Sequence, residues 1–184
     1  MKLLFVIDMQ NDFIDRVLGS PEAQAIVPKV VEKIIMADNV IFTYDTHGEN
    51  YLQTEEGKHL PIPHCIKGTE GWQLSPFINI IPDGAVENMF FFKKETFGYP
   101  WNIYEDFNYE DFTLDPRDVT EIEIVGLDTD FCVLANAMTL KAAFPNVPIT
   151  IDAACCAGST PEWHEKALDI LEHCHFNVIN RKKE

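Results

Sequence analysis

Short apolar runs recur along this chain at intervals that leave room for a helix between them, and this alternation restricts the fold more than any other feature. Residues 3–7 form the first run. Because it is continuously apolar, it is typical of a strand buried on both faces of a parallel sheet. Further strands are expected at 39–44, 89–92, 121–125, 147–151 and 176–179. Strands that alternate with helices predict parallel pairing, with helices on both faces of the sheet.

Helix signals occupy the intervals between these runs. Ser20-Pro21-Glu22 combines a capping hydroxyl with proline at the first helical position, and Thr160-Pro161-Glu162 repeats that signal before a helix that ends near Cys174. Another helix is expected over 130–144. The predicted fold class is therefore α/β, a Rossmann-like three-layer α/β/α arrangement with a central, mostly parallel sheet. We expect residues 1–184 to form a single domain, because no repeat or interdomain linker interrupts the pattern.

The composition argues against several function classes. A formal net charge of −16 disfavours binding to nucleic acid or to anionic membranes, because their phosphates would be repelled. No apolar run is long enough for a transmembrane helix, and the N-terminal run is too short for a signal peptide. The five cysteines lack the spacing of a disulfide framework, which favours a reducing compartment. We expect a cytoplasmic protein, and a homo-oligomer is compatible with the sequence.

Cys132 stands where the fourth expected strand runs into a helix, within VGLDTDFCV at 125–133. The first turn of a helix presents free backbone N–H groups and a partial positive charge. A thiol at this place is expected to ionise more easily and to act as a nucleophile, while the N–H groups hold an oxyanion. The competing interpretation is a buried cysteine that packs as a small apolar side chain.

Two charged residues also follow expected strands. Asp8 ends the first strand and Lys94 follows the third. Since ligands of open α/β sheets bind outside the carboxyl ends of the strands, both could meet Cys132 in one pocket. A desolvated carboxylate can accept the thiol proton, and an ammonium lowers the pKa of the thiol. Taken singly, Asp8 could be a helix or turn cap, and Lys94 a solvated surface lysine.

The stretch from Asp45 to about Leu74 is far longer than an ordinary connection, which favours a functional loop. It opens with a carboxylate and an imidazole two residues apart, and further possible ligands follow. These residues are Asp45, His47, Glu55, Glu56, His59 and His64. Mixed carboxylate and imidazole donors suit Zn²⁺, Mn²⁺ or Fe²⁺ rather than Ca²⁺. His59 and Glu55 are plausible decoys, and an Asp-x-His pair alone is also common among ordinary surface residues.

The three strand-end motifs together resemble those of the isochorismatase-like cysteine hydrolases, and within them the nicotinamidase branch. IDMQNDF at 7–13 is similar to the opening motif of that family, KETF at 94–97 to its lysine motif, and GLDTDFCV at 126–133 to its nucleophile motif Gly-x-x-Thr-Asp-x-Cys-Val. The motifs occur in family order across essentially the whole chain.

The resemblance implies a catalytic triad of Asp8, Lys94 and Cys132. It also implies a cis peptide bond before Asp128, which would aim the backbone N–H groups of Asp128 and Cys132 into an oxyanion hole. A cis bond outside proline costs about 3 kcal/mol, so it would be a strained functional feature. The family often has a small residue where Asp128 stands, and the acid is a departure from its pattern.

The resemblance further implies a metal site and an aromatic substrate pocket. The nicotinamidase pattern of one carboxylate, two imidazoles and a further glutamate matches Asp45, His47, His64 and Glu56, with zinc as the expected metal and manganese or iron as alternatives. Phe13 matches an aromatic residue that stacks on the pyridine ring. Phe97 is expected as a second wall of the pocket. Trp72 is expected near the substrate or in a structural role.

These observations predict a metal-dependent cysteine amidohydrolase that converts nicotinamide, a small-molecule amide, to nicotinate and ammonia through a thioester. One alternative is a hydrolase of the same superfamily that acts on a carbamoyl or ureido substrate, which an intact triad without bound metal would favour. The other is a non-catalytic thiol- or metal-binding protein on the same fold, which resistance of Cys132 to alkylation would favour.

Overall fold

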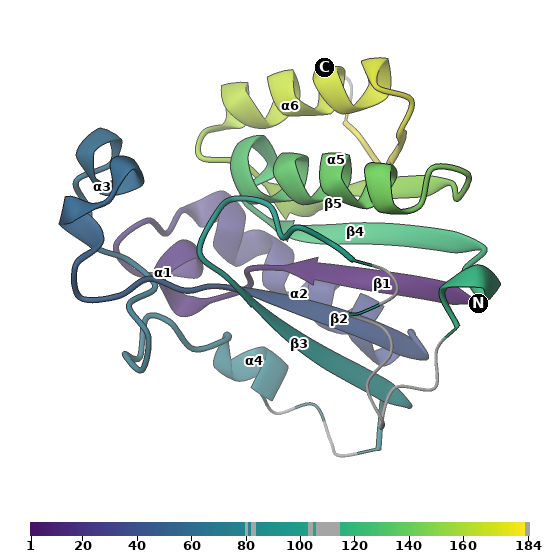
Figure 1. The fold of residues 1–184 in the computed structure, drawn as a ribbon, viewed down its shortest axis with the longest axis horizontal. Coiled ribbons are helices and arrows are strands. Elements are labelled where there is room, and N and C mark those ends of the chain that lie inside the picture. Colours follow the sequence, from purple (N-terminus) through teal and green to yellow (C-terminus); the bar gives the residue numbers. More distant parts are fainter. Residues whose placement is uncertain (80, 82–83, 103–104, 106–114, 183–184) are drawn as a thin grey trace.

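In the computed structural model, which describes residues 1–79, 81, 84–102, 105 and 115–182, six strands form one sheet with all neighbours parallel (Figure 1). The order across the sheet is β3-β2-β1-β4-β5-β6. The strands are β1 (Lys2–Ile7), β2 (Asn39–Asp45), β3 (Asn88–Lys94), β4 (Glu121–Leu127), β5 (Ile149–Ala157) and β6 (Asn177–Ile179). Because all strands are parallel, their carboxyl ends lie at one edge. The strand order reverses between β1 and β4, and open α/β sheets bind ligands at such a point.

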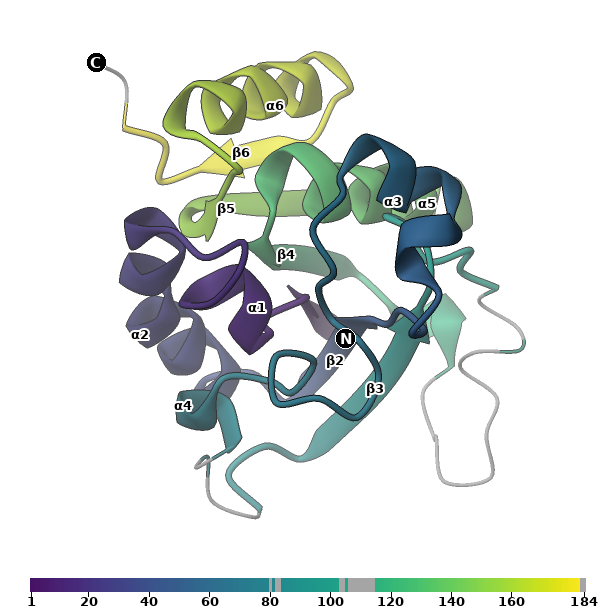
Figure 2. The same ribbon diagram turned by 90° about the vertical axis from the view of Figure 1, so that its left-hand side faces the viewer.

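Helices cover both faces of the sheet, which confirms the expected three-layer class (Figures 1 and 2). One face packs against α1 (Asn11–Ile14), α2 (Pro21–Ile35) and α4 (Pro76–Asn79). The other packs against α5 (Leu134–Ala143) and α6 (Pro161–His173). The proline-containing starts are as expected, since Ser20 accepts a hydrogen bond from the N–H of Ala23 and Thr160 accepts one from Trp163.

Strand β1 shows how the apolar runs specify this packing. Leu3, Phe5 and Ile7 point to the layer of α5 and α6, while Leu4 and Val6 point to the layer of α2. All five are at most 3% exposed, and each such side chain contributes about 1.5–3 kcal/mol by leaving water. A continuously apolar run is therefore required of a strand that has helices on both sides.

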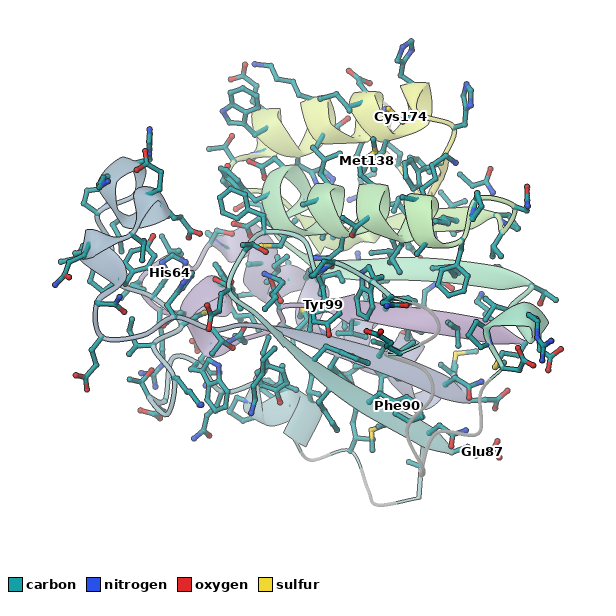
Figure 3. The ribbon with its side chains drawn as sticks, in the orientation of Figure 1. His64, Glu87, Phe90, Tyr99, Met138 and Cys174 are labelled. Carbon is teal, nitrogen blue, oxygen red and sulfur yellow. The ribbon has the colours of Figure 1, made fainter. Side chains whose placement is uncertain are left out.

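The long connection after β2 contains two short helical segments, η1 (Tyr51–Gln53) and α3 (Glu55–His59). It returns to the sheet through bridges between His47 and Ile66 and between Gln10 and Leu74. Figure 3 shows His64 of this connection at the carboxyl edge of the sheet, whereas Glu87, which precedes β3, lies at the opposite edge. A third short segment, η2 (Pro116–Asp118), precedes β4.

The segment after β4 differs from the single α-helix expected over 130–144. Thr129–Val133 forms a π turn, and the α-helix α5 begins only at Leu134. The N–H of Val133 donates to the carbonyl of Asp128 at 3.0 Å, five residues back, which widens the turn that carries Cys132. Such π turns are frequent at functional sites. Among the described residues, no helix is long and apolar enough to cross a membrane.

Candidate active site and metal centre

Asp8 occupies the turn at the end of β1, where its side chain is fully buried. Its φ of +47° lies in the left-handed region, which aspartate tolerates better than most residues. The Thr43 hydroxyl donates to Oδ1 of Asp8 at 2.7 Å, and the backbone N–H of Asp8 donates to the same hydroxyl at 3.2 Å. Thr43 on the neighbouring strand therefore holds the carboxylate in place.

Lys94 ends β3, and its buried ammonium joins three groups from separate strand ends. Its Nζ lies 2.6 Å from Oδ2 of Asp8, 3.2 Å from Oδ1 of Asp45 and 3.3 Å from Sγ of Cys132. The contact with Asp8 is an ion pair between opposite charges. Among the described residues, Oδ2 of Asp8 has no hydrogen-bond partner of good geometry. The structure thus places carboxylate, ammonium and thiol around one point.

The protonation of these groups follows from their burial. Burial raises the pKa of Cys132 well above its ordinary value; Lys94 lowers it, and Asp8 and Asp45 raise it further. Burial would lower the pKa of Lys94, but Asp8, Cys132 and Asp45 raise it well above its ordinary value. The expectation that the helix start makes the thiol more acidic is wrong for the free protein, because desolvation and two carboxylates outweigh one ammonium. The thiol is neutral and needs a base.

A glycine permits the close approach of the ends of β4 and β1. Gly126 has φ of +122°, and a Cβ at this position would collide with the carbonyl oxygen of Ile7, the residue before Asp8. The expected cis bond before Asp128 is absent: no peptide bond is cis among the described residues, and Asp128 has extended backbone with φ of −85° and ψ of 146°. A trans bond avoids the cost of a cis bond outside proline, and the π turn positions Cys132 instead.

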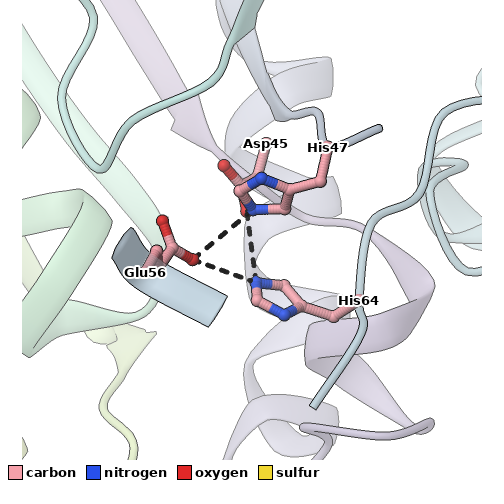
Figure 4. Close-up of side chains that lie close together, drawn as sticks. All are labelled: Asp45, His47, Glu56 and His64. Atoms are coloured by element: carbon pink, nitrogen blue, oxygen red, sulfur yellow. Dashed lines mark hydrogen bonds and ion pairs between the residues drawn. The ribbon is translucent and has the colours of Figure 1, made fainter. Parts of the chain in front are cut away.

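Asp45 at the end of β2 and three side chains of the following connection, His47, Glu56 and His64, converge beside this triad (Figure 4). His47 Nε2 lies 2.9 Å from Oδ2 of Asp45 and 3.5 Å from Oε1 of Glu56, while His64 Nε2 lies 3.4 Å and 3.6 Å from the same two oxygens. Tetrahedral ligands at 2.0–2.2 Å from zinc are separated from one another by about 3.3–3.6 Å. The spacing and chemistry of these donors therefore fit a divalent transition metal.

Neighbouring groups orient the donors. The Nδ1–H of His64 donates to the Ile62 carbonyl at 2.9 Å, and this fixes the tautomer that leaves Nε2 free to bind a metal. The ring of Tyr51 packs against both imidazoles, with its centroid 4.7 Å from that of His47 and 4.9 Å from that of His64. Glu55, by contrast, pairs with Lys58 at 2.9 Å on the exposed side of α3, so the structure brings Glu56 and not Glu55 to the cluster.

Asp45 links the two groups of residues. Its Oδ1 faces Lys94, and its Oδ2 faces His47 and His64. Burial would raise the pKa of Asp45, but its contacts with the two imidazoles and the charge of Lys94 hold it well below its usual range. One carboxylate therefore belongs to both the metal cluster and the charge balance of the triad.

Both groups open into a cavity of about 770 Å³. Cys132, Asp45, Glu56 and His64 line it, as do Phe13 and Phe97. This volume is ample for a small aromatic amide.

A sequence profile of the Isochorismatase domain matches residues 2–183. The chain belongs to this family. Its relatives and structural neighbours include nicotinamidases. The nicotinamidase of Saccharomyces cerevisiae is 25% identical over 223 residues, which cover 98% of this chain and 100% of the yeast enzyme. The crystal structure of a nicotinamidase/pyrazinamidase from Bacillus subtilis superposes with a TM-score of 0.77 at 27% identity, covering 96% of this chain and 98% of that one.

A third family relative carries a metal. The pyrazinamidase of Pyrococcus horikoshii, solved in complex with zinc, superposes with a TM-score of 0.69 at 27% identity, covering 98% of this chain and 99% of that one. The four-residue cluster of the present chain is a group that could hold such an ion.

The aromatic residues expected at the substrate take different places. Phe13 is buried in the cavity wall with its ring 5.5 Å from that of His64, and Phe97 is a more exposed wall residue packed on Phe131 at 5.3 Å. Trp72 does not line the cavity. Its indole N–H donates to Thr46 at 2.9 Å, because the connection turns the ring toward the sheet edge, so the expected substrate contact is corrected to a structural role.

Sequence reasoning missed several residues that position the site. The amide of Gln10 donates to the Asp45 and Trp72 carbonyls at 2.9 and 2.7 Å and accepts from the Asp45 N–H at 2.7 Å. Asp12 accepts from the N–H of Cys65 at 2.7 Å, next to His64. Their polar side chains directly after an apolar strand were the available signal.

On the other side of the cavity, Asn136 joins two segments. Its side-chain amide donates to the carbonyls of Phe97 and Cys132 at 3.0 and 2.8 Å and accepts from the N–H of Tyr99 at 3.1 Å. Asn136 therefore ties the segment after β3 to the nucleophile turn. An asparagine between two alanines, four positions after Cys132 and so one helical turn along the same face, is the sequence signal that points to it.

Proposed function

We propose that this protein is a metal-dependent cysteine amidohydrolase that converts nicotinamide to nicotinate and ammonia. The observation that carries the proposal is the Lys94 ammonium, which contacts the thiol of Cys132 and the carboxylates of Asp8 and Asp45, the last of which belongs to the metal-type cluster. The nicotinamidases among its relatives support the choice of amide. A binding protein would bury these charges without a use that offsets the cost of their desolvation.

Asp8 serves as the base. Because burial keeps the free thiol neutral, the proton of Cys132 passes to the Asp8 carboxylate as the sulfur attacks the carboxamide carbon. The new C–S bond forms as the carbonyl π electrons move to oxygen. Collapse of that intermediate breaks the C–N bond, and Asp8 returns the proton to the leaving ammonia. Water then hydrolyses the thioester, giving the carboxylic acid and the thiol.

Lys94 compensates the charge that moves between sulfur and carboxylate. Its Nζ contacts both Asp8 and Cys132, so the negative charge remains beside the ammonium whichever group carries it. In a site from which water is excluded, a fixed cation of this kind stabilises charge more strongly than it would in water.

The backbone N–H groups of Asp128 and Cys132 are the proposed oxyanion hole. The N–H groups that donate to the Asp128 carbonyl and close the π turn are those of Phe131 and Val133, which leaves the amide of Cys132 out of these bonds. Loss of one such donor typically costs a factor of 10² to 10³ in rate, or about 3–4 kcal/mol.

Asp45, His47, Glu56 and His64 would hold the metal, with zinc favoured by two imidazoles and a spacing near the tetrahedral value, and manganese or iron as alternatives. An ion held there would supply a Lewis acid for a ring nitrogen of the substrate. Phe13 and Phe97 provide the aromatic walls. We place the enzyme in the cytoplasm, since all five cysteines are free and the nucleophile requires a reduced thiol.

The test is an ammonia-release assay with nicotinamide beside pyrazinamide, a carbamoyl amide and a ureido amide, run on metal-loaded and chelated protein. Nicotinamide should be the preferred substrate, and chelation should abolish its turnover. Cys132→Ala should retain metal and lose activity, whereas Cys65→Ala, which removes a buried thiol outside the cavity wall, should remain active. Turnover of the ureido or carbamoyl amide alone, or full activity of Cys132→Ala, would refute the proposal.

A further inference from the structure

Asp128 places an acidic side chain in the wall of the reaction cavity. The residue lies between the end of β4 and the π turn that carries the nucleophile. It lines the same cavity as Cys132, His64 and Phe13, and it is partly buried. An acid at this position shares the cavity with any group bound at the thiol.

No structural task accounts for this carboxylate. An aspartate before a helical turn ordinarily caps it, but the Asp128 side chain makes no capping hydrogen bond. Within the part of the chain that the structure describes, no hydrogen bond or ion pair holds it. The neighbouring Asp130, in contrast, accepts hydrogen bonds from the N–H and the hydroxyl of Ser159 at 2.8 and 2.6 Å. Asp130 is a structural acid, and Asp128 is left facing the cavity.

The remaining charges of the site balance without Asp128. Asp8 pairs with Lys94, and the carboxylates of Asp45 and Glu56 would balance a divalent ion. Burial raises the pKa of Asp128 to about 7; the carboxylates of Asp130 and Asp8 contribute, and His64 opposes them. Because Asp128 lines one cavity with Cys132 and His64, it lies on the side of the nucleophile and the ligand cluster. When ionised, the Asp128 carboxylate is a negative charge in the cavity wall that no cation described in the structure pairs with.

We propose that Asp128 is a specificity-determining residue that disfavours carboxylates and so discriminates the neutral carboxamide substrate from the anionic product. This inference rests on the proposed function, since substrate and product of an amide hydrolysis differ in charge at the reacting carbon. On the proposed function the product carboxylate would lie beside the thiol, in the cavity whose wall includes Asp128. Repulsion between the two anions weakens product binding and favours release.

The size of the effect follows from Coulomb's law. Two like charges about 6 Å apart at an effective dielectric constant of about 20–40 repel enough to weaken binding about tenfold to hundredfold. The neutral carboxamide does not experience this repulsion. The ratio of the two dissociation constants, for nicotinate and for nicotinamide, therefore isolates the charge effect from a general loosening of the pocket.

The experiment measures both dissociation constants by calorimetry on metal-loaded protein in a Cys132→Ala background, which prevents turnover. A pH of about 8.5 keeps a carboxyl with a pKa of about 7 ionised. Asp128→Asn removes the charge at nearly constant shape. Glu55→Gln is the matched control, because Glu55 lines the same cavity at its exposed rim, where its side chain is 75% exposed and paired with Lys58.

Asp128→Asn should lower the nicotinate-to-nicotinamide ratio about tenfold to hundredfold, and Glu55→Gln should leave it within about twofold. An unchanged ratio, or equal changes for both ligands, would overturn the inference while leaving turnover of nicotinamide by the wild-type enzyme intact. Failure of the proposed function has a different signature, since the wild-type protein would then release no ammonia from nicotinamide.

Discussion

Replacement of Thr43 by valine tests how the buried base is held. The hydroxyl of Thr43 donates to Oδ1 of Asp8 at 2.7 Å and accepts from the Asp8 N–H at 3.2 Å, and both side chains are fully buried. Valine has nearly the same shape, so the substitution removes these hydrogen bonds without opening a cavity. Water cannot replace them at a site with no exposed surface.

The expected magnitude follows from the charge of the acceptor. A hydrogen bond to a charged group contributes about 1.5–3 kcal/mol, and its buried partner is left unsatisfied, so Thr43→Val should lower the free energy of unfolding by about 2–3 kcal/mol. For a chain of 184 residues this corresponds to a fall in Tm of about 4–12 °C. Burial raises the pKa of Asp8, and the Thr43 hydroxyl opposes this rise because it donates to the ionised form. Loss of the hydroxyl should therefore raise the pKa of Asp8 further.

The assay combines urea denaturation with the pH dependence of kcat/KM for nicotinamide. Since Asp8 acts in its ionised form, a higher pKa should move the acid limb of the profile to higher pH. Thr139→Val is the control, because the Thr139 hydroxyl bonds only carbonyls of its own helix; its stability should change by less than about 0.5 kcal/mol. An unshifted acid limb in Thr43→Val, with stability equal to wild type, would refute this description of the base.

Three further changes have defined outcomes. His47→Ala should strip the metal, as measured by elemental analysis of dialysed protein, while His59→Ala should retain it; equal metal content would remove His47 from the site. Gly126→Ala should destabilise the protein by more than about 3 kcal/mol in urea denaturation, because its Cβ meets backbone, whereas Gly84→Ala, also at positive φ but in open space, should cost about 1–2 kcal/mol. Lys33 pairs with the buried carboxylates of Glu123 and Asp152 and lowers their pKa values, so the free energy of unfolding should fall as the pH drops through those lowered values. Lys33→Met should flatten this pH dependence in urea denaturation, and a pH dependence equal to that of the wild type would contradict the pairing.

The layer architecture and the meeting of the strand ends were predictable because both follow from periodicity. Continuous apolar runs predict parallel strands, and parallel strands end at one edge, so polar residues after separate strands could be expected to meet. The separation of Asp8, Lys94 and Cys132 in sequence is no obstacle to this argument.

Features that depend on the exact path of the backbone were less accessible. The π turn and the trans bond before Asp128 follow the close approach of β4 to β1 at Gly126, and no local sequence pattern specifies them. The raised pKa of Cys132 depends on burial by the whole fold, which a local helix-start argument omits. Trp72 shows the same limit, since only the course of the long connection turns its ring away from the cavity.

The choice between two adjacent glutamates was also a matter of local geometry. Thr54 caps α3 by accepting from the N–H of Gly57, and this start sets the rotation of the helix. Glu56 then points to the imidazoles and Glu55 to Lys58. If α3 began one residue earlier or later, the two glutamates would point in other directions. The composition of the segment does not indicate at which residue the helix begins.

The measurement that tests the central claim most directly is intact-protein mass spectrometry after rapid acid quench of the enzyme with excess nicotinamide, followed by peptide mapping. A thioester at the centre of Asp8, Lys94 and Cys132 should appear as one nicotinoyl group in place of one hydrogen, on the peptide that contains Cys132. Ammonia release by Cys132→Ala, or an adduct on any of the other four cysteines, would contradict the account.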